Sequence, residues 1–285
     1  MWNVPPRTAV PSSRQRASEA REGFSVWKIY PLDVGDLEYD ESEVVLRRRM
    51  GERGKERFVA WYLTDGAKHV VVDTGPPDEA HARAWHPYNN PRISERQQIG
   101  AALEQRGVGL DEINLVILTH LHWDHAGNMP LFRNADFVVS HDELAYAIDP
   151  CPIHYVAYEA VQIGLTPPFL NVMQRTRTIA MREQEVVPGL IALPTPGHTP
   201  GSISIVATTV AGPYVITGDA VSSYRNLEGD PAKKLKYLPT GIFTDLLAMW
   251  NSMALIDEKA LFQRDHVLPG HDSRVFRQHC YPDGL

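Results

Sequence analysis

Four potential metal ligands lie close together in the segment THLHWDHAGN, residues 119–128. His120, His122, Asp124 and His125 occupy positions i, i+2, i+4 and i+5. On a helix these positions would point in divergent directions, whereas a turn after the apolar segment INLVILT lets them converge. Imidazole and carboxylate groups together suit zinc, iron, cobalt or manganese. The segment therefore predicts a metal site.

Three further candidate ligands each follow an apolar segment and a turn residue. The segment GLIALPTPGH ends at His198, PYVITGD ends at Asp219 and HVLPGH ends at His271. Strand ends on one edge of a sheet lie close together, so four such ends can bring all seven ligands within reach of one another. Seven protein ligands exceed what one zinc ion binds, but they suit two ions that share a carboxylate. The ligand set therefore predicts a dinuclear site.

The elements that must position these ligands can be read from apolar segments separated by turn residues, which begin at about residue 24. The segments expected to form strands are SVWKIYPLD, FVAWYLT, HVVVDTG, INLVILT, DFVVS, GLIALPT, SISIVAT, PYVITG and HVLPG, with a hairpin turn at Asp65 and Gly66. Helices are expected over ISERQQIGAALEQRG, with a capping box of Ser94 and Gln97, over HDELAYAID, and over TGIFTDLLAMWNSMALIDEKA, whose positions 242, 246, 249, 250 and 253 would face a core. Frequent hairpins with interposed helices predict an α/β (α+β) fold of two mixed β-sheets packed together, with helices outside.

The composition is that of an ordinary globular protein, with 285 residues, 43% hydrophobic content and a formal net charge of −7. We expect a flexible N-terminal arm over residues 1–23 and a single domain over residues 24–285. The acidic balance argues against nucleic acid as a partner, and no apolar stretch of the sequence is long enough to cross a membrane. Cys151 and Cys280 are too few for a disulfide framework, so we expect reduced thiols in a cytoplasmic protein. The sequence is compatible with a homodimer.

The set THLHWDHAG, TPGHTPG, TGDA and PGH resembles the metallo-β-lactamase superfamily over residues 25–275. The resemblance implies a four-layer αββα sandwich with metal ions at one edge. It implies a first metal held by His120, His122 and His198, a second held by Asp124, His125 and His271, and Asp219 as the bridge. It also matches Asp73 in VVVDTG to the family's buried aspartate beneath the site, which would orient a ligand loop or a histidine. The alternative for Asp73 is a turn-capping role before Gly75.

A dinuclear site of this kind predicts hydrolysis. Two metal ions about 3.5–4 Å apart can hold a hydroxide between them at neutral pH and polarise a carbonyl group. The sequence has no G-x-S-x-G motif for a serine nucleophile. We therefore expect a metal-bridging hydroxide to attack a small lactone or ester, with two divalent ions, zinc first and iron, cobalt or manganese as alternatives. Asp124 would carry the proton to the leaving group.

Within the superfamily, the arrangement is most similar to the quorum-quenching N-acyl homoserine lactonases. These enzymes commonly place a tyrosine three residues after the bridging aspartate, where it assists the substrate carbonyl. This chain has Ser222 there, and the nearest tyrosine is Tyr224. Tyr224 is therefore a candidate catalytic residue, and the alternative is that it lines the pocket wall or packs within its loop.

Two other functions share the ligand pattern. A glyoxalase II-like thioesterase would need basic residues for its anionic substrate, which Lys233, Lys234 and Lys236 could supply. A catalytically idle metal-binding protein is the other alternative.

We expect the substrate pocket to be built from three loops, residues 76–92, 150–172 and 222–240. The aromatic residues that these loops offer are Trp85, Tyr88, Tyr155, Tyr158, Phe169 and Tyr237. They could receive an acyl chain or a ring, and the alternative is that most of them pack in satellite cores. His86 is expected at the surface, and the alternative is that it lines the pocket near Trp85 and Tyr88.

Overall fold

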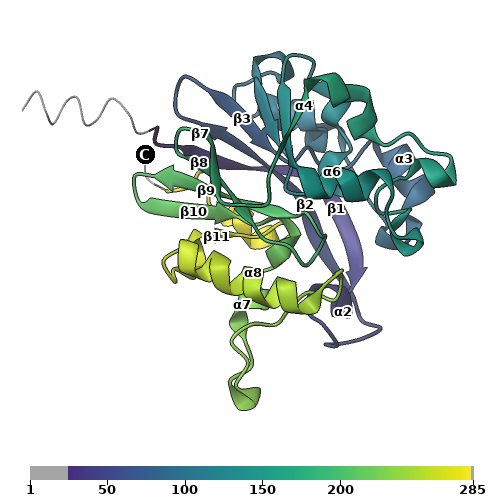
Figure 1. Ribbon diagram of the computed structural model, residues 1–285, viewed down its shortest axis with the longest axis vertical. Helices are drawn as coiled ribbons and strands as arrows, with labels where there is room; N and C mark the ends of the chain where they lie inside the picture. The colour runs from purple at the N-terminus through teal and green to yellow at the C-terminus, as the bar shows by residue number, and fades with distance from the viewer. Residues whose placement is uncertain (1–24, 284–285) are drawn as a thin grey trace, which may run out of the picture.

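Two mixed β-sheets pack face to face in the computed structural model, which describes residues 25–283 (Figure 1). The predicted arm over residues 1–23 lies outside the described residues. The first sheet has the order β1 (Lys28–Asp40), β2 (Arg53–Thr64), β3 (His69–Val72), β4 (Leu115–Ile117), β5 (Asp136–Ser140) and β6 (Thr176–Ile179). The second has the order β11 (Val267–Leu268), β10 (Gly212–Ile216), β9 (Ile203–Thr209), β8 (Leu190–Pro194) and β7 (Gln184–Val187). The predicted fold class is confirmed.

Both sheets combine parallel and antiparallel pairs. Strands β1, β2 and β3 are antiparallel, whereas β3 to β6 run parallel to one another. In the second sheet β7 to β10 are antiparallel, and β11 pairs with β10 in parallel. The chain leaves β3 and β4 at one edge of the first sheet, and it leaves β10 and β11 at one edge of the second.

The almost continuous apolar sequence of β2 follows from burial on both faces. Phe58 and Tyr62 belong to the core beneath the helices of the first sheet. Val59, Trp61 and Leu63 belong to the core between the two sheets. Successive strand residues point to opposite faces, so both sets must be apolar.

Helices cover the outer face of each sheet, which completes four layers (Figure 1). The helices are α2 (Glu41–Val44), α3 (Glu79–Trp85), α4 (Ile99–Glu104), α5 (Trp123–Ala126), α6 (His141–Ile148), α7 (Arg225–Glu228) and α8 (Leu246–Lys259). Helix α8 buries Met249, Met253 and Ile256 in a third hydrophobic core, which lies between this helix and the second sheet. Within residues 25–283, no helix combines the length and apolarity needed to span a membrane.

Two predicted helices are shorter than expected. Helix α8 starts only at Leu246, because the Asp245 side chain caps it by accepting from two backbone N–H groups. Ile242 is therefore outside the helix and 47% exposed, which corrects its predicted core position. The helix predicted from residue 93 is divided, because Gln98 has an extended ψ of 136° between a 3₁₀ turn at Glu95–Gln97 and α4.

Candidate metal centre

The seven predicted ligands gather where four strands end. His120 and His122 follow β4 directly, and Asp124 and His125 lie on the short helix α5 that comes next. The remaining three follow β8, β10 and β11 and are His198, Asp219 and His271. The first sheet thus contributes four residues and the second sheet three. The side chains form overlapping groups whose ligand atoms lie within 4.8 Å of one another.

The first group consists of three histidines. The Nδ1 atom of His122 lies 3.1 Å from Nε2 of His120 and 3.0 Å from Nε2 of His198. All three rings are buried. Three converging imidazole nitrogens are a typical set of zinc ligands.

The second group consists of two histidines and a carboxylate. The Nε2 atoms of His125 and His271 are 3.3 Å apart. The Oδ2 atom of Asp124 lies 3.5 Å from Nε2 of His271 and 3.8 Å from Nε2 of His125.

Asp219 lies between the two groups and presents one oxygen to each. Its Oδ2 atom is 3.4 Å from Nε2 of His198, in the first group. Its Oδ1 atom is 3.4 Å from Nε2 of His125 and 3.1 Å from Nε2 of His271, in the second. Oδ1 is buried and has no hydrogen-bond partner among residues 25–283. A buried carboxylate oxygen without a partner is costly, and a cation between it and the histidines would remove that cost, so the residues fit two divalent ions.

Backbone carbonyls orient two of the histidines from behind. The Nδ1 atom of His198 lies 3.0 Å from the carbonyl oxygen of Ile242, and that of His271 lies 3.1 Å from the carbonyl oxygen of Arg57. A carbonyl can only accept, so in the neutral form of each ring Nδ1 carries the proton and Nε2 presents its lone pair to the cluster.

Asp73 orients the third histidine. Its carboxylate accepts hydrogen bonds from the Thr119 backbone N–H (2.8 Å), the Thr119 hydroxyl (2.8 Å) and Nδ1 of His125 (2.9 Å). Asp73 is buried and has a φ of +59°. The structure thus places it beneath the cluster, in contact with a ligand loop and a histidine.

The direction of the pKa shift differs between the histidines of the two groups. Burial holds the pKa of His120 and His122 well below the usual value, so both rings are neutral and able to bind a metal. Burial also lowers the pKa of His271, but the nearby carboxylates of Asp219 and Asp124 outweigh it and raise that pKa. The same balance, with Asp73 added, raises the pKa of His125 well above its usual value. The carboxylates thus raise the pKa of the two histidines beside them, whereas burial lowers the pKa of the three histidines of the first group.

A cleft of about 480 Å³ opens over the cluster. Its walls come from the end of β1, from α2, from the segments around residues 86–89 and 153–157, and from residues 240–242. The aliphatic side chains that line it are Leu37, Val44, Ile153, Val156, Ala157 and Ile242, and Tyr39 and Trp123 line it as well. All three predicted loops thus contribute, the third by its two ends, Ser222 and Thr240, and the β1–α2 segment contributes from outside the predicted loops.

Most of the aromatic residues predicted for the pocket lie elsewhere. Tyr88 lines the cleft. Tyr158, Phe169 and Tyr237 are buried in the hydrophobic cores instead. Trp85 is 39% exposed and is not among the residues that line the cleft. Tyr155 does not line the cleft either.

His86 is buried and lines the cleft, which corrects the expected surface position and agrees with the alternative, a place in the pocket lining. Its ring stacks on Trp123 with centroids 3.8 Å apart and an interplanar angle of 7°. Its Nε2 lies 3.1 Å from Oε1 of Glu159, which is also buried. Both partners are distant in sequence, so no local pattern around His86 could have indicated this contact with the cleft wall.

Tyr224 does not reach the cluster, so the structure gives no support to its predicted catalytic role. Its backbone N–H donates to Oδ2 of Asp272, and the Arg274 guanidinium lies 5.0 Å from its ring centroid. Its side chain lines a separate hollow of about 360 Å³. The 3₁₀ turn Gly218–Val221 directs Ser222 into the cleft, and Tyr224 follows two residues later, where Asp272 fixes the backbone.

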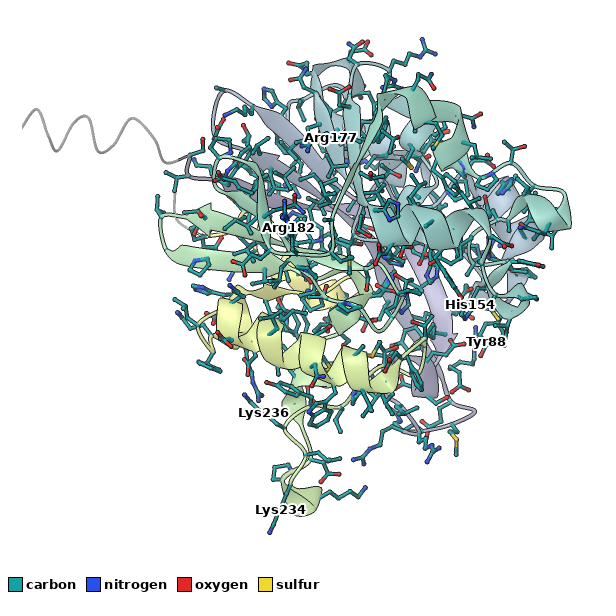
Figure 2. All side chains as sticks on the ribbon, viewed as in Figure 1. Tyr88, His154, Arg177, Arg182, Lys234 and Lys236 are labelled. Carbon is teal, nitrogen blue, oxygen red and sulfur yellow. The ribbon has the colours of Figure 1, made fainter. Side chains whose placement is uncertain are left out.

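The lysines considered for an anionic substrate lie away from the cleft. Lys236 pairs with Asp257 at 2.8 Å, and Lys233 with Asp230 at 3.4 Å. Figure 2 shows Lys234 on a loop that projects past α8, whereas Tyr88 at the cleft lies on another part of the molecule. No lysine is among the described residues that line the cleft.

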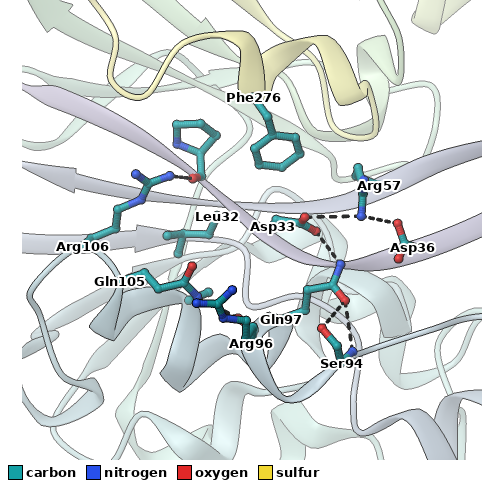
Figure 3. A pocket seen from close by; sticks show the side chains of 12 residues that line it. Leu32, Asp33, Asp36, Arg57, Ser94, Arg96, Gln97, Gln105, Arg106 and Phe276 are labelled. Atoms are coloured by element: carbon teal, nitrogen blue, oxygen red, sulfur yellow. Dashed lines mark hydrogen bonds and ion pairs between the residues drawn. The ribbon is translucent and has the colours of Figure 1, made fainter.

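A second hollow, of about 490 Å³, lies between β1, the Glu95–Gln97 turn and α4 (Figure 3). There the Arg57 side chain pairs with Asp33 and Asp36, and Gln97 donates to Asp33 at 2.9 Å. The backbone carbonyl of Arg57 is the group that orients His271. This ion-pair network therefore steadies the strand behind one of the candidate ligands.

Comparison with known proteins agrees with this geometry. An N-acyl homoserine lactonase from a Bacillus species is 28% identical over 264 residues, which cover 87% of this chain and 94% of the relative. The crystal structure of a variant of Bacillus thuringiensis AiiA, with N-decanoyl-L-homoserine bound at its active site, has a TM-score of 0.71 at 24% identity and covers 89% of this chain and 96% of its own. AidC, described as a dizinc quorum-quenching lactonase, has a TM-score of 0.65 at 14% identity, covering 88% and 89%. Residues 55–271 match the family described as the metallo-beta-lactamase superfamily. This chain belongs to the metallo-beta-lactamase superfamily.

Proposed function

We propose that this protein is a dinuclear-metal hydrolase that opens the lactone ring of N-acyl homoserine lactones. The observation that carries the proposal is the position of Asp219, whose two oxygens face two separate groups of candidate ligands. The names of the similar lactonases support the choice of substrate.

Zinc is the metal that we propose for both positions. His120, His122 and His198 would hold one ion, Asp124, His125 and His271 the other, and Asp219 would be shared. The preference of zinc for imidazole with a few carboxylates supports this choice. When bound, two such ions lower the pKa of water to about 7 and polarise a carbonyl oxygen.

The residues of the chain would supply the rest of the chemistry. Asp124 lies both at the cluster and in the cleft wall, with 14% of its side chain exposed, so it can exchange a proton with a substrate there. We propose that it delivers a proton to the ring oxygen as the lactone opens. Asp73 is buried and does not line the cleft, so we propose that it only orients His125 and the Thr119 loop.

The cleft suits an acyl chain beside a polar head. Ile153 and Ile242 are 82% and 47% exposed at its rim, and Leu37 and Val44 are buried deeper. An apolar chain that covers such side chains would remove their surface from water, at about 25 cal/mol for each Å² buried.

The first experiment is to incubate the zinc-loaded protein with N-octanoyl homoserine lactone and to measure the gain of one water by mass spectrometry. A chelated sample serves as the control, since these lactones also open slowly on their own. Fast opening that the chelator abolishes is the expected result, and opening at the rate of the chelated control would contradict the proposal.

The Asp219→Ala variant tests the shared carboxylate. We expect at least a hundredfold loss of turnover and loss of bound metal, because one carboxylate serves both positions. Asp265→Ala, which removes an exposed carboxylate remote from the cleft, is the matched control. Full activity of Asp219→Ala would exclude a dinuclear mechanism.

The absence of lysine from the described cleft wall argues against the thioesterase alternative. Rapid hydrolysis of S-lactoylglutathione without lactone opening would restore it. The cytoplasmic location and the homodimer stay predictions.

A further inference from the structure

A second buried carboxylate, Glu143, lies near the cluster without being a candidate ligand. It occupies the first turn of α6 and is 0% exposed. Burial raises the pKa of its carboxyl group, although several hydrogen bonds oppose that shift. A carboxylate that the protein keeps so far from water requires specific partners.

Those partners belong to two different ligand loops. Oε1 of Glu143 accepts from the Leu121 backbone N–H at 2.9 Å, and Oε2 accepts from the Thr199 hydroxyl at 2.6 Å. Leu121 lies between His120 and His122, and Thr199 directly follows His198. One carboxylate therefore joins the loop that follows β4, in the first sheet, to the loop that follows β8, in the second.

A tyrosine extends this contact to a ligand ring. The Tyr158 hydroxyl donates to Oε1 of Glu143 at 2.9 Å. The same tyrosine ring packs edge-on against the imidazole of His122, with centroids 4.7 Å apart and an interplanar angle of 70°. Glu143 thus fixes the backbone beside His122 and also the surface on which its ring rests.

The backbone of α6 approaches the His198 loop very closely. A Cβ atom at Gly201 would lie 2.0 Å from the Glu143 backbone nitrogen, so only glycine fits there. The Ser140 hydroxyl, which caps α6, donates to the Gly201 carbonyl at 2.6 Å. The position of Glu143 relative to this loop is therefore set by tight packing.

We propose that Glu143 is a positioning residue for the three-histidine metal position, because it holds the loops of His122 and His198 at the separation that one ion requires. The inference rests on the proposed dinuclear centre. Asp73 has the corresponding task for His125, on the other side of the cluster. Loss of Glu143 should therefore weaken one metal position more than the other.

The experiment measures zinc binding to the metal-free protein by competition with a chromophoric chelator. We expect Glu143→Ala to weaken one of the two zinc ions by about 10- to 100-fold, as is usual when a group that orients ligands is lost, and to leave the other within about threefold of wild type. Glu143→Gln should recover most of this affinity, since its carbonyl oxygen can still accept from Leu121 and Tyr158 and the Thr199 hydroxyl can accept from its amide.

Two further variants keep the test decisive. Asp257→Ala removes a buried carboxylate of α8 that bonds Tyr237, remote from the cluster, and controls for a general loss of stability. If Glu143→Ala does not fold, Tyr158→Phe and Thr199→Val each remove one hydrogen bond to Glu143 and are expected to weaken the same ion by a smaller factor.

The outcomes separate this inference from the proposed function. Equal weakening of both ions by Glu143→Ala, or unchanged binding of both, would overturn the positioning role while wild-type protein still binds two ions and opens the lactone. Binding of fewer than two ions by the wild type would instead refute the dinuclear centre itself, and the inference with it.

Discussion

The Asp73→Asn variant tests whether the tautomer of a single histidine controls the second metal position. Oδ1 of Asp73 accepts from the Thr119 backbone N–H, and Oδ2 accepts from Nδ1 of His125 at 2.9 Å. An asparagine that keeps its oxygen opposite Thr119 must turn its NH₂ group toward His125. The Nδ1 atom must then accept, so the proton moves to Nε2, the atom that faces Asp219 and His271.

The expected magnitude follows from this exchange. A histidine that carries its proton on Nε2 cannot offer that nitrogen to a metal unless it pays for the less favourable tautomer. Loss of such an orienting partner usually weakens metal binding by about 10- to 100-fold, or about 1.4–2.8 kcal/mol. Asparagine tolerates the φ of +59° at this position, so the fold should be kept.

The assay combines zinc competition with a chelator and ¹⁵N NMR of the histidine rings in the metal-free protein. We expect one ion to bind as in wild type, the other more weakly, and the pKa of the His125 ring in the metal-free protein to fall, because the charge of Asp73 helps to raise it. Asp257→Asn, another buried aspartate that bonds Tyr237 and Lys236, is the matched control. Two zinc ions bound with wild-type affinity in Asp73→Asn would refute the reasoning.

Two other predictions concern the hairpin and the cleft. Burial raises the pKa of Asp65, but hydrogen bonds from the Lys68 and Ala67 amides outweigh it and lower that pKa to about 2. A folded-state pKa below the unfolded-state value near 4 stabilises the folded protein above pH 4, and this stabilisation is lost as the pH falls through 2. Asp65→Asn should therefore lower the free energy of unfolding by up to about 2 kcal/mol at pH 7. Urea titrations between pH 4 and pH 2 should show a progressively smaller difference from wild type. Ile242→Asp should raise KM for a decanoyl lactone about tenfold and for a butanoyl lactone much less, because only the longer chain reaches the rim. The exposed Leu247→Asp is its control, and equal effects on both lactones would contradict the predicted acyl contact.

The candidate ligands could be predicted because each of the four ligand segments follows a strand within a few residues. The order of strand, turn and ligand can be read within a short stretch of sequence, and the two sheets then bring the ends of these strands together. The β2–β3 hairpin was predictable for the same reason, since its turn residues Asp65 and Gly66 directly separate the two strands. The ends of β1 and β2 that pair Asp40 with Arg53 could not be predicted. Their sequences are polar and show no strand pattern, so only the pairing of the two strands makes them extended.

The contacts that shape the site across long sequence distances could not be predicted. His86 meets Glu159 from 73 residues away, and Glu143 meets Thr199 from 56. Tyr224 was considered for catalysis on its sequence distance from Asp219. The 3₁₀ turn in between sets the directions of the side chains, and spacing alone does not reveal such a turn.

Each proposed metal position takes ligands from both sheets, which leads to a prediction about stability. The first would take two histidines that follow β4 and one that follows β8, and the second would take two residues of α5 and one that follows β11. Each ion would thus connect the two halves of the sandwich and would bind only the folded state. A ligand at a thousand times its Kd stabilises the folded state by about 4 kcal/mol, which corresponds to a rise in Tm of roughly 10 °C for a domain of this size. Calorimetry of zinc-loaded and chelated protein measures this difference. A chelated protein that retains its Tm after its zinc has been removed would show that the ions do not connect the sheets as the geometry requires.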